Sequence, residues 1–365
     1  MKILYITGQI ASHGGIERVT IMKLNYLVKT GNEVFLSTYE QMGRPLIYPL
    51  SDNVEYTDIA VNYNVDYNKE SLYSWRCIKL VWKHIQRTRK LINRIKPDVI
   101  VVPNFGYEYW FLPFIKGNSA IIREFHDSQY CVTHHRLKYA IDDFIQKLYD
   151  RIVVLTPQEK EYFKYKKNIE IIPNPVALSE NVSDLCAKKI ISIGRIDRVK
   201  GFEKLIEIAA LVNRKHPDWI FEIYGNGETS YVNYLRHKIH ESCLDNVILL
   251  KGYTSDVWSK LVEASIYLCT SKTESFGLTL VEAMSAGLPV VSFNCPNGPR
   301  NIIHNEEDGF LVDIDSVEKA STALIFIIEN IAERKRLGKN AYENSLRFCI
   351  DLIMKRWINL FREII

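Results

Sequence analysis

Short apolar runs alternate with longer segments of helical periodicity along most of this chain. In the first half, the runs that predict buried strands are Lys2–Thr7, Glu33–Thr38, Asp98–Val102, Ser119–Glu124 and Arg151–Leu155. A second set follows: Ile190–Gly194, Trp219–Tyr224, Val247–Leu250, Ile266–Cys269 and Pro289–Phe293. Strands that alternate with helices, such as the one expected over Gly15–Val28, are typical of parallel βαβ units. The pattern therefore predicts an α/β protein with two parallel sheets.

A rigid and then polar stretch separates the two sets of strands. Pro173 and Pro175 hold the backbone extended and cannot continue a helix. We place the linker at residues 173–188, between a domain of residues 1–178 and a domain of residues 179–350. A last helical stretch, residues 351–365, lies beyond the second set.

Length and composition agree with two cytoplasmic domains. A chain of 365 residues exceeds one ordinary core and suits two domains of about 150–180 residues. Apolar runs stay below the roughly 18 residues of a membrane span, and the N-terminus lacks the layout of a signal peptide. Seven scattered cysteines without a C-x-x-C pair indicate reduced thiols and argue against a disulfide framework or a zinc site.

Basic residues are concentrated in the first half of the chain. Residues 1–178 hold 24 Lys and Arg against 18 Asp and Glu, whereas the remainder holds 23 against 25. The segment 72–96 is basic and amphipathic, with tryptophans on its apolar side. It suits either the surface of an anionic membrane or a helix that packs on the sheet and leaves its basic face in water. No nucleic-acid recognition motif accompanies it, so we expect no nucleic-acid partner.

Two cations follow the first strand of the second set, in Gly194-Arg-Ile-Asp-Arg-Val-Lys-Gly201. Arg195 provides a planar fork and Lys200 a mobile point charge, and together they suit a diphosphate. The alternative is a pair of solvated surface cations in a loop. The flanking glycines and the carboxylates farther along the chain favour the functional interpretation.

Two carboxylates stand eight residues apart in Glu274-Ser-Phe-Gly-Leu-Thr-Leu-Val-Glu282. A turn-forming Ser-Phe-Gly separates Glu274 from an apolar, helix-period run that carries Glu282. Carboxylates accept hydrogen bonds from hydroxyls, and the free N–H groups of a helix start bind anions. The stretch therefore suits a sugar diphosphate, with the N–H groups of Phe276, Gly277 and Leu278 on the phosphates. The alternative is a charged loop followed by a solvent-facing glutamate.

A glycine pair, Gly14 and Gly15, follows the first strand and precedes a helix. Adjacent glycines let backbone approach a ligand closely, although such turns are also common without a ligand. The dinucleotide fingerprint G-x-G-x-x-G is absent here, and Tyr224-Gly-Asn-Gly-Glu228 lacks its third glycine. Both absences weaken a dehydrogenase interpretation.

Taken in order, these three motifs resemble those of the retaining glycosyltransferases of family 4. A further segment, Cys295-Pro-Asn-Gly-Pro-Arg-Asn-Ile302, resembles that of family members which act on bacterial surface polysaccharides and use UDP-linked galactose or N-acetylhexosamines. The resemblance covers nearly the whole chain and implies the GT-B fold, with two Rossmann-like domains whose parallel sheets face across a cleft. It also implies that the helix 351–365 returns to the first domain and that the domain 179–350 binds the nucleotide sugar.

The same resemblance implies roles for individual residues. Arg195 and Lys200 would neutralise the leaving diphosphate. Glu274 would contact the transferred sugar, and Glu282 would accept both ribose hydroxyls. His126, at the end of a strand, would point at the donor sugar, although a lone histidine there is more often structural. The neighbouring Asp127 has a weaker claim, as a group on the acceptor side or one that orients His126.

Two loops and the reaction also follow from the resemblance. Gly14 and Gly15 would face the donor, and the loop with Gly252 and Tyr253 would hold the nucleobase. The implied enzyme is a retaining transferase that moves galactose or an N-acetylhexosamine from a UDP-sugar to a glycan or lipid-linked glycan acceptor, in capsule or lipopolysaccharide synthesis. A UDP-sugar 2-epimerase and a non-catalytic nucleotide-sugar-binding module remain as alternatives.

We expect no metal ion or other cofactor. Asp313-Ile-Asp315 matches the D-x-D motif of the other large glycosyltransferase fold. It stands just before a predicted helix, where aspartate or serine is an ordinary cap. The family implied by the other motifs has a similar loop that binds no metal.

Overall fold

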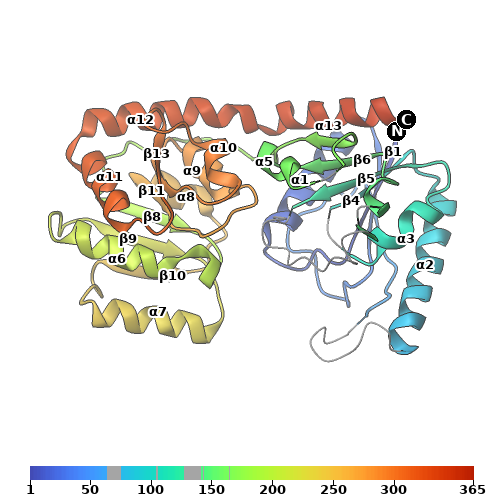
Figure 1. The fold of residues 1–365 in the computed structure, drawn as a ribbon, viewed down its shortest axis with the longest axis horizontal. Helices are drawn as coiled ribbons and strands as arrows, with labels where there is room; N and C mark the ends of the chain where they lie inside the picture. The colour runs from blue at the N-terminus through green and yellow to red at the C-terminus, as the bar shows by residue number, and fades with distance from the viewer. Residues whose placement is uncertain (64–74, 104–105, 127–140, 143, 164) are drawn as a thin grey trace. The chain divides into compact units, whose positions relative to one another are not determined.

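The computed structural model describes residues 1–63, 75–103, 106–126, 141–142, 144–163 and 165–365. The chain forms two compact units (Figure 1). The first unit comprises Met1–Pro175 together with Asp351–Ile365, and the second comprises Val176–Ile350.

The first unit is built on a seven-stranded parallel sheet of order β3-β2-β1-β4-β5-β6-β7. Its strands are β1 (Lys2–Thr7), β2 (Glu33–Thr38), β3 (Val54–Asp58), β4 (Val99–Val102), β5 (Ala120–Phe125), β6 (Arg151–Val154) and β7 (Ile169–Ile171). The helices include α1 (Gly15–Lys29), α2 (Trp75–Ile95), α3 (Glu108–Ile115), α5 (Pro157–Glu161) and α13 (Ile350–Ile364).

The second unit has a six-stranded parallel sheet of order β10-β9-β8-β11-β12-β13. Its strands are β8 (Lys189–Ile193), β9 (Ile220–Tyr224), β10 (Ile248–Gly252), β11 (Ile266–Cys269), β12 (Val290–Phe293) and β13 (Gly309–Val312). The α-helices are α6 (Phe202–Asn213), α7 (Thr229–Glu241), α8 (Val257–Val262), α9 (Leu278–Ser285), α10 (Gly298–Ile302), α11 (Val317–Glu329) and α12 (Ile331–Ser345). The short 3₁₀ helices η2 (Arg198–Lys200) and η3 (Leu346–Phe348) complete it.

The prediction of two parallel sheets in an α/β protein is confirmed. Central strands such as β4 and β11 are buried along their whole length. Helices cover both faces of such a sheet, so its central strands read as continuous apolar runs. That is the signal by which the sequence identified them.

Three strands lie outside the predicted set: β3, β7 and β13. Each stands at an edge of its sheet. An edge strand has a neighbour on one side only and tolerates a mixed sequence, as in Val-Glu-Tyr-Thr-Asp of β3, where Glu55 is exposed. Such a strand resembles a loop when it is judged by hydrophobicity alone.

The C-terminal helix α13 packs on the first unit through its apolar face. Met354, Trp357 and Phe361 are buried. The Arg356 guanidinium donates a hydrogen bond to the carbonyl of Ile171 at the end of β7. The Nζ atom of Lys23 on α1 lies 4.0 Å from the centre of the Trp357 ring.

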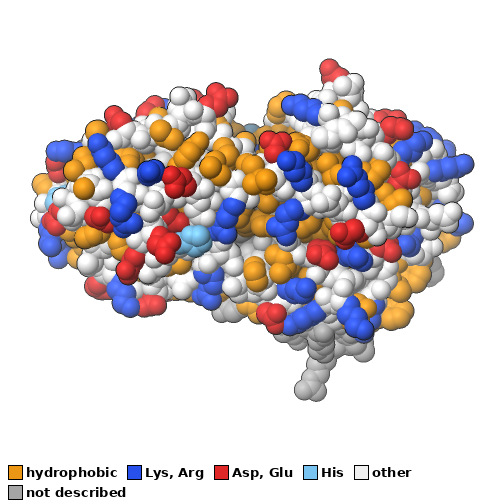
Figure 2. Space-filling model, turned by 90° about the horizontal axis from the view of Figure 1, so that it is seen from above, with side chains coloured by type: hydrophobic (Ala, Val, Ile, Leu, Met, Phe, Trp, Pro, Cys, Tyr) orange, Lys and Arg blue, Asp and Glu red, His pale blue; other side chains and the backbone are white. Residues whose placement is uncertain are grey.

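Charges of both signs are interspersed on the surface. Figure 2 shows Lys and Arg side chains alternating with Asp and Glu side chains on the face that it displays, with no continuous field of one sign. Among the described residues, no helix combines the length and the apolar character that a membrane span requires.

Candidate active site

Each sheet has one point where the strand order reverses direction. In the second unit β8 lies between β9 and β11, and in the first unit β1 lies between β2 and β4. Parallel α/β sheets bind ligands beyond the carboxyl ends of the strands at such a point. Arg195 and Lys200 follow β8, and Glu274 follows β11, so the reversal point of the second unit gathers the predicted donor residues.

Lys200 and Glu274 are in direct contact. The Lys200 ammonium donates to Oε1 of Glu274 at 2.6 Å, and both side chains are largely buried, with 23% and 12% of their surface exposed. The Ser271 hydroxyl donates to the same oxygen at 2.7 Å. Burial is the largest single influence on the pKa of Lys200 and lowers it, but the charge and hydrogen bond of Glu274, with smaller contributions from Cys269 and Asp197, together outweigh burial and the pKa is raised. Lys200 is therefore a permanent cation.

The loops that carry this pair pack without room for side chains. Gly201 has φ of +63°, and a Cβ atom there would lie 2.2 Å from the carbonyl oxygen of Thr270. The Thr270 hydroxyl donates to the Lys200 carbonyl at 3.0 Å. The glycine that follows Lys200 thus allows η2 to lie against the end of β11, which brings Lys200 to Glu274.

Arg195 takes a different partner. Its Nε donates to Asp197 at 2.5 Å, and 77% of its side chain is exposed. Asp197 also accepts from the N–H groups of Val199 and Lys200, so it caps η2. A carboxylate therefore holds Arg195 in place while its other guanidinium nitrogens remain accessible from solvent.

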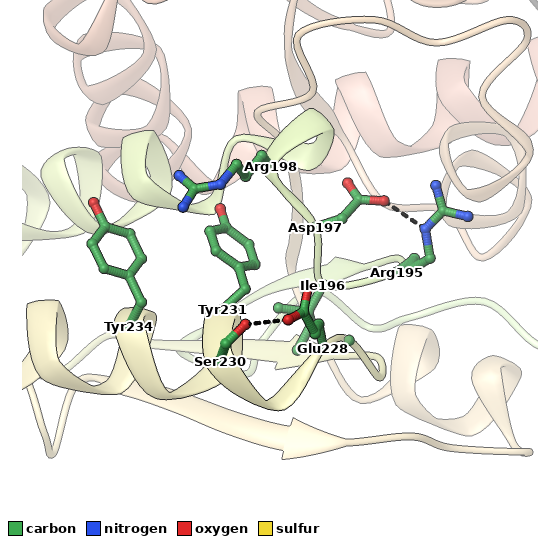
Figure 3. Close-up of a pocket in the computed structure, with 9 residues that line it drawn as sticks. Arg195, Ile196, Asp197, Arg198, Glu228, Ser230, Tyr231 and Tyr234 are labelled. Carbon is green, nitrogen blue, oxygen red and sulfur yellow. Dashed lines mark hydrogen bonds and ion pairs between the residues drawn. The ribbon is translucent and has the colours of Figure 1, made fainter. Parts of the chain in front are cut away.

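A pocket of about 430 Å³ opens beside Arg195. Figure 3 shows Arg198 over the rings of Tyr231 and Tyr234, which rise from the first turns of α7, while Arg195 lies on the other side of Asp197. The Arg198 guanidinium carbon is 5.2 Å from the centre of the Tyr231 ring. The pocket makes the flank of the Arg195 loop accessible to small molecules.

The N-terminus of α9 provides the next part of the site. Gly277 caps it with φ of +100°, a conformation that suits glycine. The first N–H groups of a helix have no partners within it, so those at the start of α9 are available to an anion. Phe276 is buried beneath this turn, and Glu282 is buried in the second turn, with 2% of its surface exposed.

The end of β10 has an open, left-handed turn. Gly252 has φ of +75°, and no atom lies within 4 Å of the position that a Cβ would take. Tyr253 follows with 47% of its surface exposed. This turn leaves space for a flat ligand group at the edge of the same sheet.

In the first unit, a carboxylate closes the loop that contains the glycine pair. Gly14 is the N-cap of α1 and Gly15 is its first residue. Glu17 in the first turn accepts hydrogen bonds from Ser12 and from Gln9, the latter at 2.9 Å. A Cβ on Gly14 would meet the Glu17 carboxylate at 2.0 Å, so a glycine here lets Glu17 fold over the loop.

His126 directly follows β5 and is buried, with 8% of its surface exposed. Its Nε2 lies 2.9 Å from Oε2 of Glu124. The same oxygen accepts from the ammonium of Lys23 on α1. Burial alone would raise the pKa of Glu124, but Lys23 and His126 outweigh it and lower that pKa to about 2. The Glu124 carboxylate that contacts His126 is thus ionised.

Family models match both units of the chain. The model "Glycosyltransferase Family 4" matches residues 13–180, and the model "Glycosyl transferases group 1" matches residues 179–344. Together they run through the glycine loop, the Arg195–Lys200 loop and both glutamates. The chain belongs to glycosyltransferase family 4.

Individual proteins support the assignment to family 4. An uncharacterized glycosyltransferase of Haemophilus influenzae is 27% identical over 98% of this chain and 98% of its own length. The poly(ribitol-phosphate) alpha-N-acetylglucosaminyltransferase of Staphylococcus aureus is 29% identical over 54% of this chain and 40% of its own. A crystal structure of a mutant of S. aureus TarM, in complex with fondaparinux, alpha-GlcNAc-glycerol and UDP, superposes with a TM-score of 0.78 at 16% identity, covering 99% of each chain. The two units therefore have the GT-B fold.

The structure divides the predicted site residues of this family 4 transferase between the units. Arg195, Lys200, Gly252, Tyr253, Glu274, Phe276, Gly277, Leu278 and Glu282 lie in the second unit, and Gly14, Gly15 and His126 lie in the first. Among them, Lys200 and Glu274 are joined by an ion pair. Asp127, a weaker candidate from the sequence, lies outside the described residues.

Several residues that shape the site were missed from the sequence. Ser271 and Asp197 hold Glu274 and Arg195, and Glu124 and Lys23 hold His126. Asp197 lies within the Gly194–Gly201 motif and Ser271 lies three residues before Glu274, so both could have been found as hydrogen-bonding neighbours. Lys23 is far from His126 in the sequence, and nothing in the apolar pattern of its helix indicates a buried charge.

The D-x-D segment is part of a helix start. Asp313 pairs with Lys319, and Asp315 has φ of +62° just before α11. Within the described ranges, no group of three or more His, Cys, Asp or Glu side chains is arranged to hold a metal ion.

Proposed function

We propose that this glycosyltransferase moves a sugar, galactose or an N-acetylhexosamine, from UDP to a glycan or lipid-linked glycan acceptor, with retention and without a metal ion. The product would be part of a bacterial surface polysaccharide such as capsule or lipopolysaccharide. The observation that carries the proposal is the buried Lys200–Glu274 pair at the strand-order reversal of the second unit, beside the start of α9.

The first task of such an enzyme is to stabilise the departing nucleotide diphosphate. Negative charge develops on the phosphate oxygen that joined the sugar to the diphosphate as this bond breaks. Fixed cations and N–H groups stabilise that charge most effectively where water is excluded. Lys200 is a largely buried cation, and Arg195 adds an exposed guanidinium held by Asp197. The N–H groups of Phe276, Gly277 and Leu278 complete the set for the phosphates.

The second task is to hold the sugar and the nucleoside. Glu274, in the loop after β11, accepts a hydrogen bond from a hydroxyl of the transferred sugar. The buried Glu282 accepts hydrogen bonds from the ribose hydroxyls. His126 contacts a donor hydroxyl, the loop of Gly14 and Gly15 lies along the donor, and Gly252 with Tyr253 holds the base. Acceptor attack on the face from which the diphosphate departs explains retention without a covalent intermediate.

The relatives support a UDP donor and a glycan product. The S. aureus relative is named as an alpha-N-acetylglucosaminyltransferase of a polyol-phosphate polymer, and the TarM crystal contains UDP with a GlcNAc-bearing compound. An α-linked product from an α-linked nucleotide sugar means retention. Neither the family models nor these relatives support the 2-epimerase considered from the sequence.

A panel of UDP- and GDP-sugars tests the proposal. Hydrolysis of each donor and thermal stabilisation of the enzyme are measured with and without EDTA. We expect stabilisation by UDP and by one UDP-sugar, unchanged by EDTA, and slow hydrolysis of that sugar which Glu274→Ala abolishes. Strict dependence on a divalent ion, or hydrolysis that survives Glu274→Ala, contradicts the assignment of the site. No response to any nucleotide favours the binding-module alternative.

We also propose that the basic helix α2 of the first unit contacts the membrane. On α2, Trp82 and Ile78 have 63% and 50% of their surface exposed. Arg89 lies on the same stripe by helical spacing, and Lys79 borders it, both exposed. Lys83, in contrast, donates to the carbonyl of Ala60 at 3.1 Å and belongs to the fold. Residues 72–74 of the predicted segment lie outside the described residues.

An apolar stripe bordered by cations fits an anionic lipid surface. Co-sedimentation with vesicles of phosphatidylglycerol and phosphatidylethanolamine tests it against vesicles of phosphatidylcholine. We expect binding to the anionic vesicles alone, and a loss of about tenfold in Trp82→Ser. Phe326→Ser, an exposed aromatic on α11, serves as the control. Equal binding by both variants contradicts the contact.

A further inference from the structure

A buried relay of charged groups lies directly beneath His126. The side chains of Lys23 and Glu124 have 1% and 2% of their surface exposed, and that of His126 has 3%. The ammonium of Lys23 and Nε2 of His126 both contact one oxygen, Oε2 of Glu124. Lys23 lies on α1, Glu124 lies on β5, and His126 directly follows β5.

The packing around the relay excludes water. The ring of Trp357 on α13 covers the Lys23 ammonium. Tyr5 of β1 is fully buried, and its burial and then the nearby charge of Glu124 raise the pKa of its hydroxyl. Burying an ion pair rarely stabilises a fold more than apolar residues of the same volume would. A function for this pair therefore explains it better than stability does.

We propose that Glu124 is a positioning residue that fixes the tautomer and the orientation of His126, and that Lys23 is the counter-ion that keeps Glu124 ionised. The inference rests on the proposed contact between His126 and the donor sugar. An ionised carboxylate accepts hydrogen bonds only, so the His126 nitrogen that faces it, Nε2, carries a proton. In the neutral ring, Nδ1 is then the acceptor available to a sugar hydroxyl.

The shared oxygen makes the arrangement specific. Lys23 and His126 converge on Oε2, so any movement of the ammonium would displace the atom that holds the imidazole. Lys23 lies 101 positions before Glu124 in the chain and does not contact His126 in the hydrogen bonds described. Its influence on transfer would pass through Glu124.

Two double variants separate positioning from charge. Lys23→Met with Glu124→Gln removes both charges and keeps an acceptor oxygen, whereas Lys23→Met with Glu124→Leu removes the acceptor as well. Both replace the buried pair by uncharged side chains of similar volume, which is often tolerated in a core. Thermal unfolding of the full chain, with Glu222→Gln as a buried-glutamate control in the second unit, establishes that the variants are folded.

The direct readout is the tautomer of His126. Full-length protein labelled with ¹⁵N-histidine is studied by NMR, and His126→Asn assigns the signal. We expect a single Nε2–H form in the wild type and loss of that preference in the Leu double variant. An Nδ1–H form in the wild type, or the averaged signal of an unconstrained imidazole, overturns the inference.

The turnover number of each variant should depend on whether His126 keeps its Nε2–H form. Loss of the group that orients a metal-ligating histidine typically costs about 10- to 100-fold, and Glu124 has the same orienting role in this proposal. We therefore expect kcat to fall by about that factor in the Leu double variant, with a smaller change in the donor KM, and to be preserved in whichever variant retains the Nε2–H form. A kcat that is independent of the tautomer overturns the inference. Full activity of His126→Ala would instead refute the proposed sugar contact, while the tautomer measurement still decides the role of Glu124.

Discussion

At the scale of single residues, the second unit combines its chemistry in one buried contact. Lys200 approaches Glu274 at 2.6 Å and is held as a cation by it. In the proposed donor complex, a diphosphate would compete with Glu274 for the ammonium and would free the carboxylate for a sugar hydroxyl. The pair would then couple the two halves of the donor, because binding of the phosphates would release the group that we propose to bind the sugar.

Removing the Lys200 charge should weaken transition-state stabilisation directly. We expect Lys200→Met to lower kcat/KM by about 100-fold or more, since loss of one donor to a developing anion costs that much in other enzymes. Steady-state release of the nucleotide diphosphate measures it. Lys204→Met, on the next turn and paired with Glu207, is the matched control and should keep its activity. A loss confined to KM would mean that Lys200 binds donor and transition state equally.

Glu108 makes stability depend on pH. It is fully buried on α3, and burial raises its pKa from 4.5 to about 8, although the Tyr39 hydroxyl and the Arg123 charge act in the opposite direction. Between these values the folded chain keeps a proton that the unfolded chain releases. The stabilising contribution is therefore present at low pH and is lost as the pH rises through about 8.

Urea unfolding between about pH 6 and pH 9 tests this dependence. We expect the wild type to lose about 1–3 kcal/mol more free energy of unfolding over that range than Glu108→Gln, which has no proton to lose. Glu55→Gln, an exposed carboxylate of β3, should behave as the wild type does. Parallel curves for Glu108→Gln and the wild type would contradict the buried, protonated state.

At the scale of elements, the site depends on how closely the start of α6 approaches β11. Gly201 forms the left-handed turn between η2 and α6 and lies against the Thr270 carbonyl. The glycine that ends the Arg–Lys motif is therefore needed for packing. Its removal would shift Lys200 away from Glu274.

A pair of glycine substitutions separates strain from collision. Gly201 and Gly117 have nearly the same φ, +63° and +64°, but no atom lies within 4 Å of a Cβ on Gly117. Gly117→Ala should cost about 1–2 kcal/mol for the left-handed backbone alone. We expect Gly201→Ala to cost more than that, because of the 2.2 Å collision with Thr270, and to reduce turnover as well. Urea unfolding and donor hydrolysis measure both effects, and equal losses would contradict the packing argument.

At the scale of the whole molecule, each unit has its own sheet and core, and the chain end completes the first. The helix α13 follows the second unit in the sequence but buries its apolar face on the first. The Trp357 ring also covers Lys23. The stability of the first unit therefore depends on residues that follow the second unit in the sequence.

Truncation after Ile350 should unfold the first unit selectively. Met354, Trp357 and Phe361 are each at most 1% exposed, and about 1.5–3 kcal/mol for each buried side chain approaches the roughly 5–15 kcal/mol that stabilises a whole domain. We expect hydrogen exchange to show loss of protection in β1–β7 and retained protection in β8–β13. Lys355→Ala, exposed on the same helix, is the control. A uniform loss over both units would contradict their independence.

The sequence by itself determined the fold class, the two parallel sheets and the donor motifs. Buried central strands are apolar on both faces, and the glycines and charged residues at strand ends stand in short motifs of fixed spacing, so both leave a local signal. Tertiary structure decided the edge strands β3, β7 and β13, the contact between Lys200 and Glu274, and the relay from Lys23 to His126. These features depend on residues that are distant in the chain and meet only when the sheets form. A pattern read over a few neighbouring residues carries no information about such meetings.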